Sequence, residues 1–281
     1  MNNTRLDYFV DLDRYPIHEL DSDAGQNLIA RCHKMMAEDA LCLLPDFLRA
    51  AAVSKLCAEI TALEAKAHEI NYPSTPYGWM DNAGFPPDHP RSQLLPRCCK
   101  IITTELLDPS GACVELFKLD ELTEFVRWLL QYEELYRSEC PTLAIQINIM
   151  DNDETFGWHF DTNDGVVSFT IQNAENGGGF EYAPLIRDEG QENYDEVSQV
   201  LIGQGQVKQP DMSPGTFSLF LGRRSLHKVS PVGNTQLNRY SLLFSYDRQP
   251  GMVFPQKTCE RLKGHSSAPY LGAKTRSRSQ S

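Results

Sequence analysis

His159 and Asp161 frame a short motif, in the segment "WHFDTND" at 158–164, that could hold a metal ion. On a β-strand, residues two positions apart point to the same face, so the imidazole and the carboxylate would lie together while Phe160 points away. The same triplet also fits a polar patch on an ordinary strand. The motif therefore needs partners elsewhere in the chain before it can be interpreted.

A second histidine, His227, follows His159 by 68 positions in the segment "GTFSLFLGRRSLHKVSPV". Two imidazoles and one carboxylate on one face of a metal form the facial triad of non-heme Fe(II) oxygenases, which leaves coordination positions open. We predict that His159, Asp161 and His227 are metal ligands. The other histidines fall in expected helices or loops without an acid at strand spacing: His18, His33, His68, His89 and His265.

Arg239 comes 12 positions after His227, in "NRYSLLFSYD". A guanidinium group is a planar, permanently charged fork that suits a carboxylate, and Ser241 would lie on the same strand face. An isolated arginine would be read as an ordinary ion-pair partner. Its place after the two histidine motifs favours a cosubstrate carboxylate site.

The segments that carry these residues look like strands. Short β-branched and aromatic runs begin near Thr142 and are separated by Gly, Asn, Asp and Pro. We expect strands in "TLAIQINIM", "GVVSFTIQN", "GGFEYAP", "EVSQVLI", "GTFSLFL", "LHKVSPV" and "RYSLLFSYD". Many short strands at close spacing predict a sandwich or a barrel.

The part before residue 142 has mostly helical spacing of its apolar residues. We expect helices in "AGQNLIARCHKMMAEDA", "DFLRAAAVSKLCAEITALEAKAHEI" and "ACVELFKLDELTEFVRWLLQYEEL", a short strand at "CLLP", and an arm at 1–20. The expected division is a helical part at 1–141 with a Pro-, Gly- and aromatic-rich lid-like loop at about 71–97, a β core at 142–250, and a partly disordered C-terminal extension at 251–281. All three would form one functional unit.

These motifs match a known family. "HFDTNDGVVSFTIQNAENGGGFEY" and "GTFSLFLGRRSLHKVSPVGNTQLNRYSLLFSYD" resemble the Fe(II)/2-oxoglutarate-dependent dioxygenases, including their prolyl-hydroxylase-like branch, over roughly residues 142–248. The resemblance implies an α+β fold with a double-stranded β-helix (jelly-roll, cupin-like) core and a helical part packed on it. It implies Fe(II), 2-oxoglutarate and O2, with iron on His159, Asp161 and His227, and 2-oxoglutarate on Arg239 and Ser241.

Within that superfamily, the sequence looks most like the radical halogenases of free amino acids and their hydroxylase relatives. The halogenases have glycine where Asp161 stands here, which leaves room for chloride on the metal. An aspartate fills that position, so we expect hydroxylation of an unactivated C–H bond, with release of succinate and CO2. The expected substrate is a free amino acid, and a basic one is a candidate.

Five residues are candidates for contacts with the substrate. Arg91 and Arg97 flank "SQLLP" and could take a carboxylate, although a solvated loop arginine is the simpler reading. Asp164 and Asp247 could reach an amine, and Asp164 could equally cap a turn. Trp79 could close the pocket as part of the lid, or could simply pack on the core.

Composition limits the remaining possibilities. With 281 residues, 41% of them hydrophobic, the chain can bury one large core. A net charge of −12 argues against nucleic acid as a partner. We expect no membrane span, a cytoplasmic location and eight free cysteines, and the sequence does not predict the oligomeric state. Two alternatives stay open: a hydroxylase of a protein side chain or other metabolite, and a cupin-like metal-binding protein without turnover.

Overall fold

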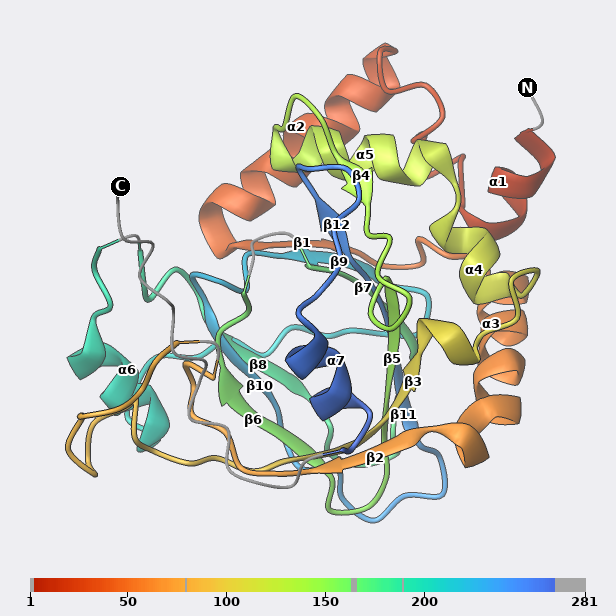
Figure 1. Cartoon of the computed structure of the whole chain (residues 1–281). Helices are drawn as coiled ribbons and strands as arrows, with labels where there is room; N and C mark the ends of the chain where they lie inside the picture. The colour runs from red at the N-terminus through yellow and green to blue at the C-terminus, as the bar shows by residue number, and fades with distance from the viewer. Residues whose placement is uncertain (1–2, 79, 163–165, 189, 266–281) are drawn as a thin grey trace, which may run out of the picture.

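The computed structural model describes residues 3–78, 80–162, 166–188 and 190–265. Its centre is a ten-stranded antiparallel sheet in the order β1-β9-β7-β11-β5-β3-β6-β10-β8, with β2 beside β3 (Figure 1). The sheet curls until its ends meet, because Leu41 of β1 packs in one apolar cluster with Tyr182 of β8 and Phe220 of β9. This is the α+β jelly-roll architecture that the sequence predicts.

The strands of the large sheet are β1 (Leu41–Leu44), β2 (His68–Asn71), β3 (Arg97–Thr103), β5 (Ile145–Met150), β6 (Thr155–His159), β7 (Val166–Gln172), β8 (Phe180–Ala183), β9 (Phe217–Phe220), β10 (Leu226–Val229) and β11 (Arg239–Phe244). A two-stranded sheet pairs β4 (Tyr136–Arg137) with β12 (Tyr246–Asp247). The helices are α1 (Asn3–Phe9), α2 (Asp23–Asp39), α3 (Ala50–Leu63), α4 (Ala112–Phe117), α5 (Asp120–Leu130), α6 (Tyr194–Leu201) and α7 (Gln256–Leu262), with short 3-10 turns at Glu64–Lys66 and Thr104–Leu106. Strands β1 to β3 precede residue 142, so the sheet draws on both halves of the chain.

Alternation along β11 divides the two faces of the sheet. Tyr240 and Leu242 belong to the main apolar cluster, which also takes in side chains of α2, α3 and α5. Arg239, Ser241 and Leu243 line a cavity on the other face. The period of two that is inherent in a strand therefore separates residues that hold the fold from residues that can meet a ligand.

One expected strand is a helix. "EVSQVLI" lies in and just after α6, where Val197 and Val200 are buried against Tyr77 and Phe160. The two valines stand three positions apart, which is the spacing of one helix face. Their β-branched side chains suggested a strand, but packing against a second apolar cluster favours the helix.

The N-terminal expectations need correction at three places. The helix expected through residue 70 ends at Leu63, and the chain then forms β2, so His68 lies on a strand. The segment 112–135 contains two helices, α4 and α5. The described part of the expected arm, residues 3–20, is packed on the fold, because Phe9, Tyr15 and Ile17 are buried in the main cluster. The alternation of buried and exposed side chains in β2 was not recognised in the sequence, because the apolar residues before β2 have a continuous helical spacing.

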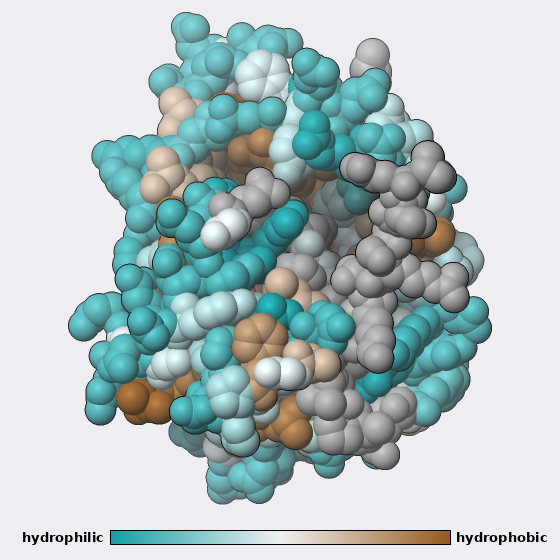
Figure 2. Space-filling view, turned by 60° about the vertical axis from the view of Figure 1, so that its left-hand side comes forward, coloured by the Kyte–Doolittle hydropathy of each residue, from teal (hydrophilic) through white to brown (hydrophobic). Residues whose placement is uncertain are grey.

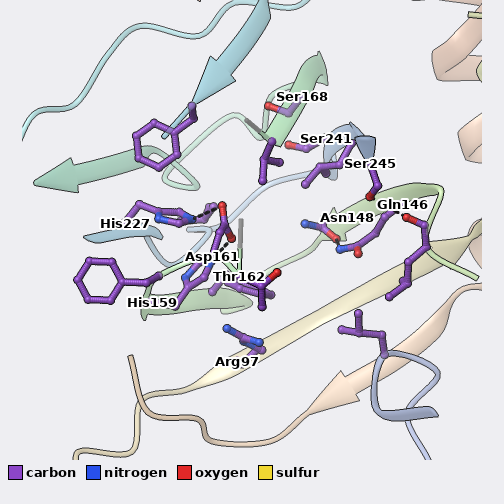
Figure 3. Close-up of a pocket in the computed structure, with 18 of the residues that line it drawn as sticks. Arg97, Gln146, Asn148, His159, Asp161, Thr162, Ser168, His227, Ser241 and Ser245 are labelled. Carbon is purple, nitrogen blue, oxygen red and sulfur yellow. Dashed lines mark hydrogen bonds and ion pairs between the residues drawn. The ribbon is translucent and has the colours of Figure 1, made fainter. Parts of the chain in front are cut away.

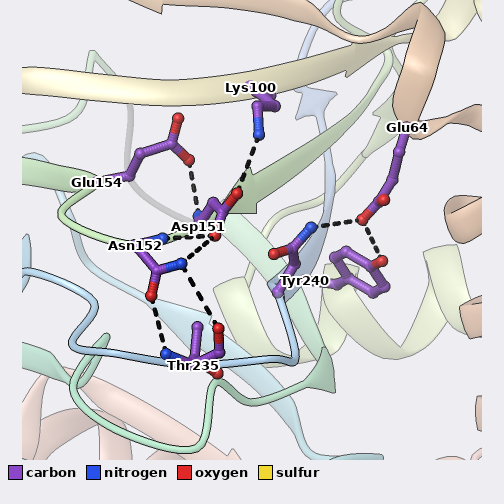
Figure 4. Close-up of polar contacts among 8 residues, drawn as sticks. Glu64, Lys100, Asp151, Asn152, Glu154, Thr235 and Tyr240 are labelled. Carbon is purple, nitrogen blue, oxygen red and sulfur yellow. Dashed lines mark hydrogen bonds and ion pairs between the residues drawn. The ribbon is translucent and has the colours of Figure 1, made fainter.

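A polar network fixes the chain on both sides of Arg239 (Figure 4). The Glu64 carboxylate accepts a hydrogen bond from the amide of Asn238 at 2.8 Å and another from the hydroxyl of Tyr240. Further back, the amide N–H of Thr235 donates to the side chain of Asn152 at 2.8 Å. The start of β11 is therefore held by the 3-10 turn that follows α3 and by the β5–β6 turn.

The surface and the thiols agree with the composition. The face in Figure 2 is mostly hydrophilic, with small separate apolar patches. All eight cysteines are free thiols, as expected, and five of them are buried. Among the described residues, no helix combines the length and the apolar character needed to cross a membrane.

Candidate functional site

The three predicted metal ligands come together. His159 ends β6 and His227 lies on β10, and the two are directly paired across the antiparallel strands. The Asp161 carboxylate lies 3.9 Å from Nε2 of His159 and 3.6 Å from Nε2 of His227. One ligand atom from each residue falls within 4.8 Å of the others, and Figure 3 shows the three side chains grouped together. Two nitrogens and one oxygen at this spacing suit a divalent transition metal.

Backbone carbonyls orient both imidazoles. Nδ1 of His159 lies 2.9 Å from the carbonyl oxygen of Gly157, and Nδ1 of His227 lies 3.0 Å from that of Ser225. A proton on Nδ1 would be donated to each carbonyl, which leaves the lone pair on Nε2 for a metal. Burial, together with the charges of His227 and Arg97, lowers the pKa of His159 well below its usual range. The neutral imidazole is the form that binds a metal ion.

Gly222 leaves the room that Asp161 needs. A Cβ atom at this glycine would stand 2.0 Å from a carboxylate oxygen of Asp161. The Asp161 amide N–H also donates to the Gly222 carbonyl at 3.0 Å. Sequence reasoning missed this residue, although a glycine at the turn before "RRSLH" was a signal that could have been used.

Arg239 is a buried cation on the same cavity. Its side chain donates to the Ser241 hydroxyl at 2.6 Å, and burial lowers its pKa to about 10. Within the described part of the chain, no carboxylate pairs with it. A buried guanidinium without an anion is costly, so a ligand carboxylate here would gain a strong charge-assisted contact. Gly178 permits this placement, because a Cβ atom there would stand 3.0 Å from Cδ of Arg239.

The three predicted metal ligands and Arg239 share one cavity of about 300 Å³. Its other polar lining residues are Arg97, Gln146, Asn148, Thr162, Ser168, Ser218, Ser241, Ser245, Thr258 and Arg261. Figure 3 places the triad on one side and Gln146, Asn148 and Ser245 across from it. The volume falls at the lower end of the range for small-molecule sites.

The candidate substrate contacts differ in whether they line the cavity. Arg97 lines the cavity. Arg91 does not, because its side chain donates to Asn82 at 2.9 Å and stacks on Phe85 within the loop. Asp247 also lies outside the lining and accepts the backbone N–H of Gln249. Trp79 and Asp164 lie outside the described residues.

The expected lid-like loop borders the metal motif. The N–H of Gly157 donates to the carbonyl of Pro96 at 2.8 Å, and the N–H of Phe160 donates to that of Pro76 at 2.9 Å. The Tyr77 ring packs on Phe160 with centroids 5.0 Å apart. Both ends of the loop are therefore attached to the segment that carries His159 and Asp161.

Sequence reasoning missed one charged side chain of the cavity. Arg261 of α7 is only 9% exposed and lines the cavity beside Thr258 and Leu262. The segment 251–281 was expected to be an extension, and no local pattern indicated that it returns to the site. Only the packing of α7 brings Arg261 there.

Comparisons with known proteins support the fold. No family model matches this sequence, and no curated protein matches it. Among solved structures, an oxidoreductase of the 2OG-Fe(II) oxygenase family from Burkholderia pseudomallei aligns with a TM-score of 0.51 and 18% identity, over 79% of this chain and 92% of that one.

Two further structures agree with that alignment. The epimerase SnoN from nogalamycin biosynthesis, described as α-ketoglutarate-dependent, gives a TM-score of 0.55 at 12% identity, over 79% of this chain and 83% of that one. A Trichoplax adhaerens prolyl hydroxylase, in complex with a peptide fragment, gives 0.50 at 13% identity, over 89% and 99%. The chain has the fold of the 2-oxoglutarate- and Fe(II)-dependent oxygenases, which confirms the predicted double-stranded β-helix.

Proposed function

We propose that this protein is an Fe(II)- and 2-oxoglutarate-dependent dioxygenase that hydroxylates an unactivated C–H bond of a free amino acid. One observation carries the proposal. The triad of His159, Asp161 and His227 opens onto the same cavity as the buried Arg239. A metal site and a carboxylate site in one cavity are what a chelating 2-oxo acid requires.

Each part of the site has a role in this chemistry. With iron and 2-oxoglutarate bound, the centre would use O2 to hydroxylate a substrate C–H bond, with one oxygen atom entering the substrate and the other entering succinate as 2-oxoglutarate loses CO2. His159, Asp161 and His227 would hold the metal, and Arg239 with Ser241 would hold the distal carboxylate of 2-oxoglutarate. The walls of the cavity would exclude water and keep one substrate carbon close to the metal.

Arg97 supports an amino acid as the substrate. Its guanidinium carbon lies 4.0 Å from the centroid of the Phe156 ring and 5.8 Å from that of Tyr72. Among the described residues, no acidic side chain pairs with it. A stacked guanidinium that faces a cavity is well suited to bind a carboxylate, and an amino acid supplies one next to the carbon that is oxidised.

Asp161 supports hydroxylation. The proposed relatives, which are the hydroxylases related to the amino-acid halogenases, differ from the halogenases at this position. The carboxylate of Asp161 faces both histidine Nε2 atoms, so it would occupy the position that a halide needs. The product would therefore gain one oxygen atom.

We also propose that residues 1–141, 142–250 and 251–281 act as one functional unit. Arg97, His227 and Arg261 come from the three parts and line one cavity. Removal of α7 should therefore impair turnover, although it leaves all three metal ligands in place.

The first experiment is an anaerobic UV–visible titration with Fe(II) and 2-oxoglutarate, followed by succinate measurement in air. We expect a chelate absorption band, and succinate formation that free amino acids stimulate and peptides do not. Stimulation by peptides alone would favour a hydroxylase of a protein side chain. A metal that binds without a response to 2-oxoglutarate would favour a cupin-like binding protein, a reading that Arg239 and Ser241 argue against.

A further inference from the structure

Two thiols from distant parts of the chain meet beside the cavity. Cys140 lies in the segment between β4 and β5, and Cys259 lies on α7, 119 positions further along. Their Sγ atoms are 3.8 Å apart. The sulfur atoms of a disulfide are about 2.05 Å apart, so the gap that must close is less than about 2 Å. The two elements therefore already place the thiols within reach of each other.

Both of these elements form the wall of the cavity. Thr258 and Leu262, on either side of Cys259, line the cavity, and so does Leu143, which follows Cys140 in the β4–β5 segment. In Figure 1, α7 lies in front of the curled sheet. A bond between the two thiols would therefore act on the wall itself and not on a remote surface.

The chain that leads into α7 is already attached to the same segment. The hydroxyl of Ser138 donates to the carbonyl of Met252 at 3.1 Å, and the backbone N–H of Glu139 donates to the same carbonyl at 2.9 Å. The thiol pair extends this attachment from the chain before α7 into the helix. The position of Cys259 is thus fixed relative to Cys140 from both sides of the contact.

The two thiols differ in acidity. Burial opposes ionisation of Cys140, but backbone N–H groups of Phe254, Thr142 and Leu143 donate hydrogen bonds to its sulfur and lower its pKa. The N–H of Leu143 lies 3.4 Å from that sulfur. Burial raises the pKa of Cys259, whose thiol is hydrogen-bonded to Cys140. A thiolate beside a protonated thiol is the arrangement from which disulfides form.

We propose that Cys140 and Cys259 are a redox modification site, at which oxidation forms a disulfide that fixes α7 against the β4–β5 segment and holds the cavity wall closed. This inference goes beyond the proposed function and does not depend on it, because it concerns the wall and not the ligand. Reduction of the disulfide frees α7 again. Exchange of ligands with the cavity would then be faster under reducing conditions than under oxidising ones.

A peroxide is the oxidant that this step requires. Hydrogen peroxide accepts two electrons from the two thiols: its O–O bond and both S–H bonds break, one S–S bond forms, and two water molecules leave. Cys259 is only partly buried, so a molecule of this size can reach the pair from solvent.

The test begins with the reduced full-length protein and one equivalent of hydrogen peroxide. Two of the eight thiols should then resist alkylation, and a peptide map should identify them as Cys140 and Cys259. Amide hydrogen exchange in α7 should slow by at least about tenfold on oxidation and recover with dithiothreitol. The melting temperature should rise by several degrees, because the bond closes a long loop of the unfolded chain.

Two variants and a matched control locate the effect. Cys140→Ser and Cys259→Ser should each lose the disulfide and the slowing of exchange in α7. Cys57→Ser is the control, because Cys57 is also partly buried but its sulfur donates to the side chain of Gln172 at 3.3 Å. This variant should form the disulfide as the wild type does. The comparison of oxidised and reduced wild type needs no substitution, so it holds even if a serine variant does not fold.

The proposal fails on either of two results. One is a peptide map in which peroxide joins other cysteines, or oxidises Cys140 or Cys259 singly without a link between them. The other is a disulfide at Cys140 and Cys259 that leaves hydrogen exchange in α7 as fast as in the reduced protein, which would show that the bond does not hold the wall.

Discussion

His159 and His227 are directly opposed residues of the antiparallel β6–β10 pair, with ring centroids 4.0 Å apart. Neighbouring strands lie about 4.8 Å apart because their backbones are hydrogen-bonded, so the sheet itself sets the spacing of these two imidazoles. The register shifts between His227 and Val229, immediately after the pair. Such irregularities re-aim side chains at the ends of strands.

Loss of any one triad residue should abolish iron-dependent turnover. We expect His159→Ala, Asp161→Ala and His227→Ala to keep the far-UV circular dichroism of the wild type and to form no succinate, because two ligands do not hold the metal in place. His265→Ala, at an exposed histidine outside the cavity, is the control. Succinate formation at the wild-type rate in one variant would remove that residue from the site.

Arg239→Ala should raise the requirement for 2-oxoglutarate far more than it changes iron affinity. The variant leaves a ligand carboxylate without its buried partner, which costs about 3–5 kcal/mol, or roughly a hundredfold to several thousandfold in affinity. Separate anaerobic titrations with iron and with 2-oxoglutarate would measure the two effects. Arg223→Ala, at an exposed arginine, should change neither. Unchanged 2-oxoglutarate affinity in Arg239→Ala would assign the role to Arg97 or Arg261.

Glu64 should act on 2-oxoglutarate through Arg239. It holds the residues on both sides of that arginine, Asn238 and Tyr240, but does not line the cavity. Glu64→Ala should weaken 2-oxoglutarate binding several-fold and leave iron binding unchanged, and Glu64→Gln should restore part of the loss. Glu124→Ala removes a carboxylate that is hydrogen-bonded on α5 instead, and should leave both affinities unchanged. Equal effects of the Glu64 and Glu124 variants would indicate general destabilisation.

Phe160→Ala should destabilise the segment that carries His159 and Asp161. Phe160 is 3% exposed and packs on Tyr77 of the loop and near the guanidinium of Arg187. Truncation of a buried aromatic side chain costs about 3–5 kcal/mol. Chemical denaturation of the metal-free protein would measure this loss, with Tyr8→Ala at a partly exposed ring as the comparison. A loss below about 1 kcal/mol would mean that the loop does not support the motif.

Asp161→Gly should separate hydroxylation from halide binding. The wild type, in buffer that contains chloride, should give a product that gains one oxygen and no halogen. The glycine variant should lose most hydroxylation, because the carboxylate no longer holds the metal. Chlorination also needs the substrate carbon to be placed off the hydroxylation path, and one substitution does not supply that. Mass spectrometry of both products is the measurement, and a chlorinated main product from the wild type would overturn the hydroxylase assignment.

The clustering of His159, Asp161 and His227 in one cavity with Arg239 could be predicted from sequence because the signals are local, and the roles of these residues stay predictions. The spacing of His159 and Asp161 is meaningful on any strand, and β-type runs surround His227 and Arg239. The jelly-roll fold followed from the family resemblance, whereas the strand order was not predicted. Local pattern alone did not distinguish α6 from a strand. The β-branched valines favoured a strand, whereas their spacing of three positions, which is typical of a helix, was not used.

The surroundings of the substrate could not be predicted in the same way. Arg91 and Arg97 stand in one loop segment with the same apparent chance of reaching a ligand. A hydrogen bond to Asn82 turns Arg91 into a support of the loop, whereas pairing of Arg97 with Phe156 across β3 and β6 directs it to the cavity. Arg261 depends on the packing of a helix more than 100 positions away from His159. Such contacts come from tertiary structure, for which a single sequence gives no periodic signal.

The alternation along β11 has a consequence for how this protein can change. Arg239, Ser241 and Leu243 touch the cavity, while Tyr240 and Leu242 hold the helices. A mutation at Leu243 can therefore alter what the cavity accepts without opening a void beneath α3. Single substitutions on the cavity face can therefore change ligand specificity at little cost in stability. Proteins that diverge from a common ancestor with this sheet would keep similar residues on the buried face of each strand after the residues on the ligand-facing side have become dissimilar.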